Sequence, residues 1–184
     1  MVRIVTDSTA DLGKDLPARH GVDIVPLTVI HDGRSYHDGV DLETPALLDL
    51  VKQSGRLPTT AAPSVGEYGA YLAGPGDKLC ITISSRLSAS YQNALLAAQA
   101  CPPGTVRVID SLNLSTGIGL LVLRAADLRA QGKPAAEIEQ AVLEAVPRVR
   151  TSFVIETMEY LYKGGRCTAL QALVGGLLKI RPVI

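Results

Sequence analysis

The sequence predicts an α/β fold, with a parallel-sheet domain and flanking helices followed by the start of a second α/β domain. Short apolar runs alternate with segments of helical periodicity, which is typical of a doubly wound, mostly parallel sheet. The first four runs span residues 2–6, 22–30, 78–83 and 106–109. A fresh strand is expected at residues 151–155. We therefore place the first domain at residues 1–150 and the start of the second at 151–184.

The N-terminal part predicts a strand, a polar loop and a brief helix. Residues 2–6 form the strand, and Asp7-Ser8-Thr9-Ala10-Asp11 follows with hydroxyls and carboxylates that suit the N-cap of a helix through Leu16. The next apolar run, 22–30, contains Pro26, which a central strand tolerates poorly. We therefore expect a bend or a sheet edge at Pro26.

Residues 32–67 contain signals for a turn and for the ends of helices. Asp32-Gly33 predicts a turn. Thr44-Pro45 predicts the start of a helix, because the N–H that proline lacks has no partner in a first helical turn. Gly55 predicts the end of this helix. Residues 57–63 are interpreted as a loop, and Ser64 with Glu67 has the spacing of a capping box for a following helix.

The second half of the first domain repeats strand, polar turn and helix. The apolar run 78–83 leads into the serine-rich segment 84–91 and then into an Ala/Leu-rich helix that ends near Ala100. A helix is expected at residues 115–128. Another amphipathic helix is expected at 134–149.

Composition excludes several classes of protein. Hydrophobic residues make up 47% of the chain and charged residues 20%, which is typical of a globular protein rather than a disordered one. Eighteen Lys and Arg balance eighteen Asp and Glu, so the chain lacks the broad basic field that binds nucleic acid. The aromatic fraction is only 4%, with no Trp, which argues against stacking platforms for bases.

The chain is predicted to be a cytoplasmic protein without a membrane span, a metal or a cofactor. No apolar stretch reaches the roughly 18 to 20 residues that a membrane span needs. The first residues lead straight into a strand without the regions of a signal peptide. Cys80, Cys101 and Cys167 lack the spacing of a zinc or redox motif, so we interpret them as buried small hydrophobes.

Hydroxyl side chains gather where the predicted strands end. They are Ser8, Thr9, Thr59, Thr60, Ser64, Ser84, Ser85, Ser88 and Ser90. Each hydroxyl can donate a hydrogen bond, and those beside a helix N-terminus are joined by free backbone N–H groups and the positive end of the helix dipole. Such a cluster favours a carboxylate or a phosphate. Helix capping is the simpler role for each serine taken alone.

The alternative is a hydrolase or transferase that uses a serine of the Ser84 to Ser90 cluster as its nucleophile. Such a serine needs a base, and His20, His31 and His37 all precede the cluster. Neither a Gly-x-Ser-x-Gly elbow nor a Walker phosphate loop occurs. The acidic residues between positions 7 and 43 match no metal-ligand spacing and are interpreted as solvated carboxylates.

A series of short motifs runs along the whole chain. In order they are Asp7-Ser8-Thr9-Ala10-Asp11-Leu12, Pro26-Leu27, Tyr36-x-Asp38, Thr60-Ala61-Ala62-Pro63-Ser64, Ser84-Ser85-Arg86-Leu87-Ser88-Ala89-Ser90-Tyr91-Gln92, Asp110-Ser111, Glu156-Thr157-x-x-Tyr160-Leu161, Gly164-Gly165-Arg166 and Ile180-x-Pro182-Val183-Ile184. This series resembles the DegV family of bacterial fatty-acid-binding proteins. The specificity of the resemblance comes from the order of the motifs.

The resemblance implies a carrier rather than an enzyme. It implies that the chain binds one long-chain fatty acid, such as palmitate, and presents its carboxylate to a separate fatty-acid kinase for phospholipid synthesis. By the same resemblance Thr60 and Ser88 hydrogen-bond the carboxylate. Ser84, Ser85, Gly165 and Arg166 are supporting residues, and the acyl tail lies between two domains.

The chain departs from the family pattern in ways that bear on binding. The family's Thr-Ser-Gln-Pro-Ser is Thr60-Ala61-Ala62-Pro63-Ser64 here, and its Gly-Thr pair is Ala89-Ser90. One hydroxyl is thus lost while another is kept as serine. The family also continues into a second α/β domain near whose beginning this sequence stops. We therefore expect this chain to bind lipid more weakly than a longer version would, or to pair with another copy through an exposed apolar face.

Overall fold

The computed structural model of the chain describes residues 1–155 and 159–165. Contacts between residues divide the chain into two compact units, Met1–Val149 and Arg150–Ile184. The first unit contains two sheets, and it carries every hydroxyl of the predicted cluster.

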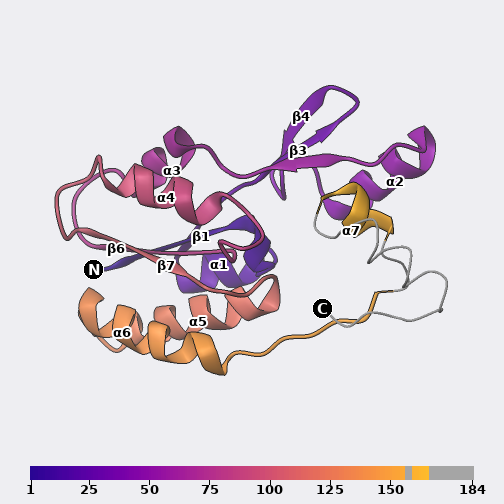
Figure 1. The fold of residues 1–184 in the computed structure, drawn as a ribbon. Coiled ribbons are helices and arrows are strands. Elements are labelled where there is room, and N and C mark those ends of the chain that lie inside the picture. The colour runs from indigo at the N-terminus through magenta and orange to yellow at the C-terminus, as the bar shows by residue number, and fades with distance from the viewer. Residues whose placement is uncertain (156–158, 166–184) are drawn as a thin grey trace. The chain divides into compact units, whose positions relative to one another are not determined.

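The larger sheet has four parallel strands in the order β2-β1-β6-β7 (Figure 1). These strands are β1 (Arg3–Asp7), β2 (Val22–Val25), β6 (Lys78–Thr82) and β7 (Val106–Asp110). All four coincide with predicted apolar runs. The predicted α/β class, a parallel sheet with flanking helices, is confirmed.

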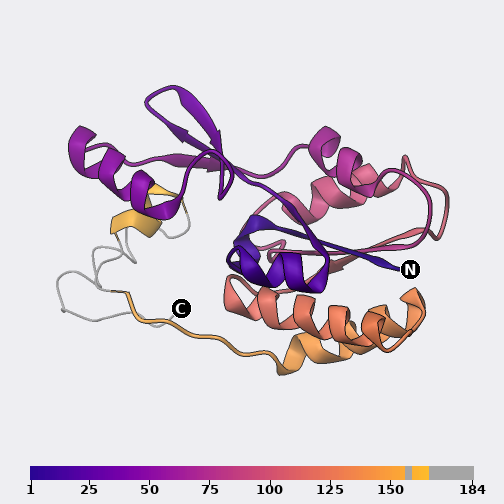
Figure 2. The same ribbon diagram turned by 180° about the vertical axis from the view of Figure 1, so that it is seen from behind.

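Helices cover both faces of this sheet (Figures 1 and 2). The helices are α3 (Val65–Leu72) and α4 (Ser90–Ala98) on one face, and α5 (Thr116–Ala130) and α6 (Ala135–Ala145) on the other. Side chains of a strand alternate between faces, so Ile4 packs in the cluster with α5 and α6 while Val5 packs with Tyr68 of α3. Burial on both faces explains why these strands are continuous apolar runs.

Short elements connect β1 to β2. The 3-10 turn η1 (Ser8–Ala10) and helix α1 (Asp15–His20) fill the connection, and Gly21 ends α1 in the left-handed conformation. A Cβ at Gly119 of α5 would lie 2.9 Å from the carbonyl oxygen of Ala10, so only glycine lets α5 approach η1 this closely.

A second, three-stranded antiparallel sheet has the order β4-β3-β5. Its strands are β3 (Thr28–His31), β4 (Arg34–His37) and β5 (Thr59–Ala61), and helix α2 (Thr44–Ser54) connects β4 to β5. The bend predicted at Pro26 is confirmed, because Pro26 separates β2 of one sheet from β3 of the other. Asp32 and Gly33 form the β3–β4 turn, both with positive φ, as a two-residue hairpin turn requires.

The loop predicted at residues 57–63 is partly wrong, because β5 lies within it. All three residues of β5 are exposed and two of them are threonines, so no apolar alternation marks the strand in the sequence. β5 is a strand because its backbone pairs with that of β3 in an antiparallel ladder.

The helix expected to be capped by residues 7–11 begins later, at Asp15, with Lys14 at its N-cap. The later helix predictions of the first unit hold. Gly55 ends α2 in the left-handed conformation. Ser64 and Glu67 form the predicted capping box at the start of α3. After α6, the 3-10 turn η2 (Val146–Arg148) completes the last helical segment.

The second unit contains helix α7 (Glu159–Lys163) within its described residues. The strand predicted at residues 151–155 is wrong, since only Val154 of this segment forms a bridge and no regular strand results. The closing motif at 180–184 lies outside the described residues. Over the part of the chain that the structure describes, no helix is long and apolar enough to cross a membrane.

Candidate functional site

Hydroxyl and carboxyl side chains meet at one edge of the parallel sheet. Strands β1, β6 and β7 run in the same direction and end at Asp7, Thr82 and Asp110. The segments that follow carry Ser8 and Ser84. This carboxyl-terminal edge is where open α/β sheets bind small ligands.

Ser84 and Ser85 build the turn after β6. Ser84 is buried, its hydroxyl oxygen accepts the Arg86 N–H at 3.2 Å, and its own N–H donates to the Asn113 carbonyl at 2.9 Å. The Ser85 N–H donates to a carboxylate oxygen of Asp110 at 3.1 Å. The Ser84 oxygen thus supports the turn, whereas Ser85 is exposed.

Ser88 lies half-buried just before helix α4. Its oxygen accepts the Ser90 N–H at 3.2 Å and lies 2.9 Å from the Ser90 hydroxyl oxygen. In the first turn of α4 the N–H groups of Tyr91 and Gln92 have no acceptor among the described residues. A hydroxyl and two free amides therefore stand at the positive end of a helix, an arrangement that favours an anion.

Thr60 lies on β5, exposed and opposite Val29 of β3. Within the described residues its side chain makes no hydrogen bond. A hydrogen bond connects the segment after β5 to α4, since the Asn93 side-chain amide donates to the Pro63 carbonyl at 2.8 Å. The described hydrogen bonds do not join Thr60 to Ser88 directly, so their shared role in binding stays a prediction.

The two remaining predicted residues belong to the second unit. Gly165 has a φ of 74°, a conformation that favours glycine. Arg166 lies outside the described residues. Their supporting role therefore stays a prediction.

A buried carboxyl that no sequence pattern indicated lies beside the hydroxyls. Asp7 is fully buried and occupies the N-cap position of η1, but its side chain makes no cap hydrogen bond there. Its carboxylate accepts hydrogen bonds from the Thr9 hydroxyl, from the Ile83 N–H at 3.0 Å and from the Tyr68 hydroxyl at 3.3 Å. Burial raises the pKa of Asp7, and these hydrogen bonds oppose part of that rise.

Histidines do not activate the serine cluster in the part of the chain that is described. The buried His31 instead has its Nε2 atom 3.1 Å from the Ser54 hydroxyl. Asp32 approaches the same ring nitrogen at 3.8 Å, whereas a catalytic triad needs the carboxylate at the other nitrogen. Among the described residues, no hydrogen bond thus joins a histidine to a serine of the Ser84 to Ser90 cluster.

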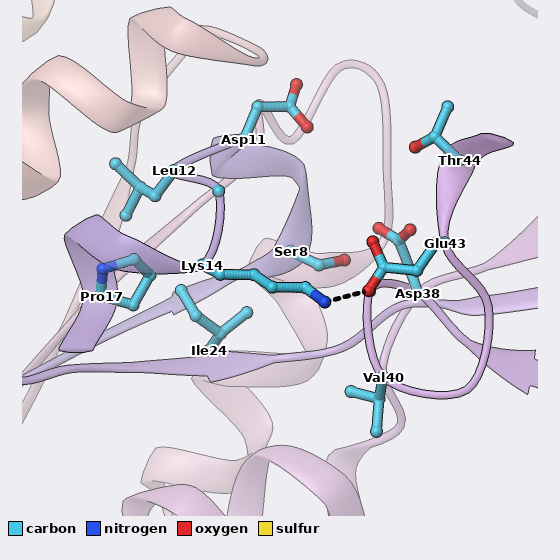
Figure 3. Close-up of a pocket in the computed structure, with 12 residues that line it drawn as sticks. Ser8, Asp11, Leu12, Lys14, Pro17, Ile24, Asp38, Val40, Glu43 and Thr44 are labelled. Atoms are coloured by element: carbon cyan, nitrogen blue, oxygen red, sulfur yellow. Dashed lines mark ion pairs between the residues drawn. The ribbon is translucent and has the colours of Figure 1, made fainter.

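A separate cavity of about 420 Å³ opens beside α1 (Figure 3). Its charged lining residues are Asp11, Lys14, Asp38 and Glu43, and the Lys14 amine pairs with Glu43 at 2.7 Å. Three carboxylates against one amine make the cavity negative, which disfavours a fatty-acid carboxylate. Among the described residues no group of three His, Cys, Asp or Glu side chains is placed to hold a metal ion.

Comparison with known proteins places the chain in a family. The profile described as "Uncharacterised protein, DegV family" matches residues 1–184. The chain belongs to the DegV family. A DegV domain-containing protein of Caldanaerobacter subterraneus is 36% identical over the whole chain, which spans 66% of that relative. The family resemblance seen in the sequence is confirmed.

Two solved structures of fatty-acid-binding proteins are similar in fold. A DegV family protein from Thermus thermophilus, described by its fatty-acid binding, is 36% identical with a TM-score of 0.84, over 99% of this chain and 66% of that one. A stearic-acid-binding protein from Eubacterium ventriosum is 28% identical with a TM-score of 0.79, over 92% of this chain and 63% of that one. The chain thus spans just under two thirds of the length of these proteins.

Proposed function

We propose that this DegV family chain binds one long-chain fatty acid, such as palmitate, and holds its carboxylate with the hydroxyls of Ser88 and Thr60. The observation that carries this proposal is the position of Ser88, half-buried at the N-terminus of α4 beside two amides that have no acceptor within the described part of the chain. The fatty acids bound by the Thermus and Eubacterium proteins support it. No other cofactor is required.

The proposed role is that of a carrier in the cytoplasm. Neutral hydroxyls and backbone amides stabilise a carboxylate without a strong counter-ion, so its oxygens stay available for transfer of a phosphoryl group. A separate fatty-acid kinase would use the presented carboxylate. We further propose that residues 151–184 begin a second α/β domain, which the separation of a unit from Arg150 onward supports.

Removal of either hydroxyl tests the carboxylate site. Ser88→Ala and Thr60→Ala each remove a hydrogen bond to a charged group, worth roughly 1.5 to 3 kcal/mol. Palmitate should therefore bind about tenfold to a hundredfold more weakly to each variant, as measured by calorimetric titration. Thr116→Ala is the matched control, because Thr116 is exposed in the first turn of α5. Unchanged affinity in both site variants would contradict the site.

A further inference from the structure

The two hydroxyls of the proposed carboxylate site come from different layers of the first unit. Thr60 lies on β5 of the antiparallel sheet, whereas Ser88 lies just before α4, which covers one face of the parallel sheet (Figure 1). One carboxylate can accept a hydrogen bond from both hydroxyls only if the two segments keep a fixed spacing. A contact that sets this spacing therefore takes part in binding without touching the ligand.

The backbone around Thr60 is fixed in the strand and in the segment that follows it. Thr60 pairs with Val29, and Ala61 pairs with Thr28, in the antiparallel ladder with β3. The ring of Pro63 fixes its φ and restricts the preceding residue to extended conformations. The chain from Thr60 to Pro63 is therefore stiff, so a contact made at Pro63 also positions Thr60.

The Asn93 side chain makes such a contact. Its amide Nδ2 donates to the Pro63 carbonyl oxygen at 2.8 Å. The N–H of the same peptide bond, which belongs to Ser64, donates to the Glu67 carboxylate at 2.7 Å. This peptide unit is thus held from both sides, by α4 and by α3. Pro63 is buried and Asn93 is half-buried, so water competes little for the bond between them.

Asn93 is also close to Ser88 through the backbone of α4. Its N–H donates to the carbonyl oxygen of Ala89 at 2.9 Å, and Ala89 is the N-cap residue that directly follows Ser88. The Ser88 N–H donates in turn to the Ser84 carbonyl at 3.2 Å. One side chain in the first turns of α4 therefore connects the segment of Ser88 with the segment of Thr60.

Two other polar contacts connect the antiparallel sheet with the layers of the parallel sheet. The Ser8 hydroxyl oxygen accepts the Leu27 N–H at 3.1 Å, ahead of β3. The Nε2 atom of His37, at the end of β4, lies 3.8 Å from the Glu67 carboxylate. Neither contact reaches the segment that directly follows β5. Among the described residues, Asn93 is therefore the side chain of α4 that fixes this segment.

We propose that Asn93 is a positioning residue for the carboxylate site, and that its bond to Pro63 holds the Thr60 hydroxyl at the distance from Ser88 that one carboxylate spans. This inference rests on the proposed function. Loss of the bond leaves Ser88 and the amides of α4 in place but frees the segment that carries Thr60. Truncation of Asn93 should therefore cost the contribution of Thr60, although its hydroxyl is still present.

The experiment compares the palmitate affinities of single and double variants of the full chain by calorimetric titration. Asn93→Ala removes the amide without adding a charge near the carboxylate. It should weaken binding about tenfold, and no more than Thr60→Ala does, because it can forfeit only the Thr60 contact. In the Thr60→Ala background it should change the affinity less than about twofold, since no hydroxyl is left to position. In the Ser88→Ala background it should again weaken binding about tenfold.

A control variant and a measurement without ligand accompany this comparison. Gln99→Ala truncates an exposed amide at the other end of α4 and should bind palmitate as wild type does. Circular dichroism spectra establish that each variant folds, and Asn93→Leu, which also removes the amide, tests the same link if Asn93→Ala does not fold. In hydrogen exchange measured by mass spectrometry, residues 59–64 should exchange faster in Asn93→Ala than in wild type, whereas α4 should exchange alike.

Other outcomes contradict the proposal. Equal weakening by Asn93→Ala in the wild-type, Thr60→Ala and Ser88→Ala backgrounds would show a general structural role, and faster exchange along all of α4 would show the same. Unchanged binding in the wild-type background would mean that the bond to Pro63 positions nothing. In these cases the carboxylate site stands and only the role of Asn93 fails. If Thr60→Ala and Ser88→Ala themselves bind palmitate as wild type does, the proposed site fails, and the role of Asn93 is overturned with it.

Discussion

Asp7 links the stability of the molecule to pH through one buried side chain. Its pKa is raised in the folded state because burial disfavours the charge, so between the unfolded and folded pKa values the folded chain binds more protons. Its stabilising contribution is complete below the unfolded value of about 3.9 and is lost as pH rises through the folded value. Each pH unit between the two values corresponds to about 1.4 kcal/mol.

Replacing Asp7 by Asn should remove this dependence. The free energy of unfolding of Asp7→Asn, minus that of wild type, should rise with pH from about pH 4 and level off above the folded pKa of Asp7. Urea unfolding at a series of pH values measures the difference. Asp127→Asn, on the exposed face of α5, is the control and should show no such rise. A difference that falls with increasing pH would mean that Asp7 is charged and stabilised in the fold.

Residues with local partners could be predicted, and residues with distant partners could not. Ser64 and Glu67 form a capping box across three positions, so their spacing alone indicates the cap. Asp7 meets Tyr68 across 61 positions and Ile83 across 76. A local pattern therefore suggests an exposed cap for Asp7, and only the sheet topology shows that it is buried.

At the scale of elements, the capping box fixes the start of the helix that carries Tyr68. The Ser64 oxygen accepts the Glu67 N–H at 3.2 Å, and a Glu67 oxygen accepts the Ser64 N–H at 2.7 Å. Tyr68 follows directly and extends to Asp7 across the core. A predictable local signal thus positions a side chain whose partner is not predictable.

The β3–β4 hairpin depends on the backbone of Gly33. The φ of Gly33 is 77°, and an added Cβ would meet nothing within 4 Å. Gly33→Ala should therefore lower the free energy of unfolding by about 1 kcal/mol through backbone strain alone. Gly69 also has open space but lies within α3, where alanine is favoured by about 0.5 to 1 kcal/mol. Urea unfolding should therefore give opposite signs for Gly33→Ala and Gly69→Ala. Equal effects would contradict the left-handed turn.

Burial decides which strands the sequence reveals. β6 is buried along its whole length and is visible as an apolar run. β4 and β5 are mostly exposed, and their residues look like loop residues. β4 and β5 therefore escaped prediction, although the apolar run 22–30 covers most of β3 and the Asp32-Gly33 turn was recognised.

At the scale of the whole molecule, the ordered series of motifs indicated the family, which no single local pattern did. They identified the family, which the match over residues 1–184 confirms. Composition and alternation led independently to the parallel α/β sheet. The proposed carboxylate site joins residues from β5 and from the segment before α4, which no spacing along the chain could bring together.

Native mass spectrometry of the purified chain, before and after organic extraction, tests fatty-acid binding most directly. We expect an added mass that corresponds to one long-chain fatty acid per chain, which extraction removes and added palmitate restores. A chain that carries no lipid and also takes up no palmitate at any concentration below its solubility limit would contradict the proposed function.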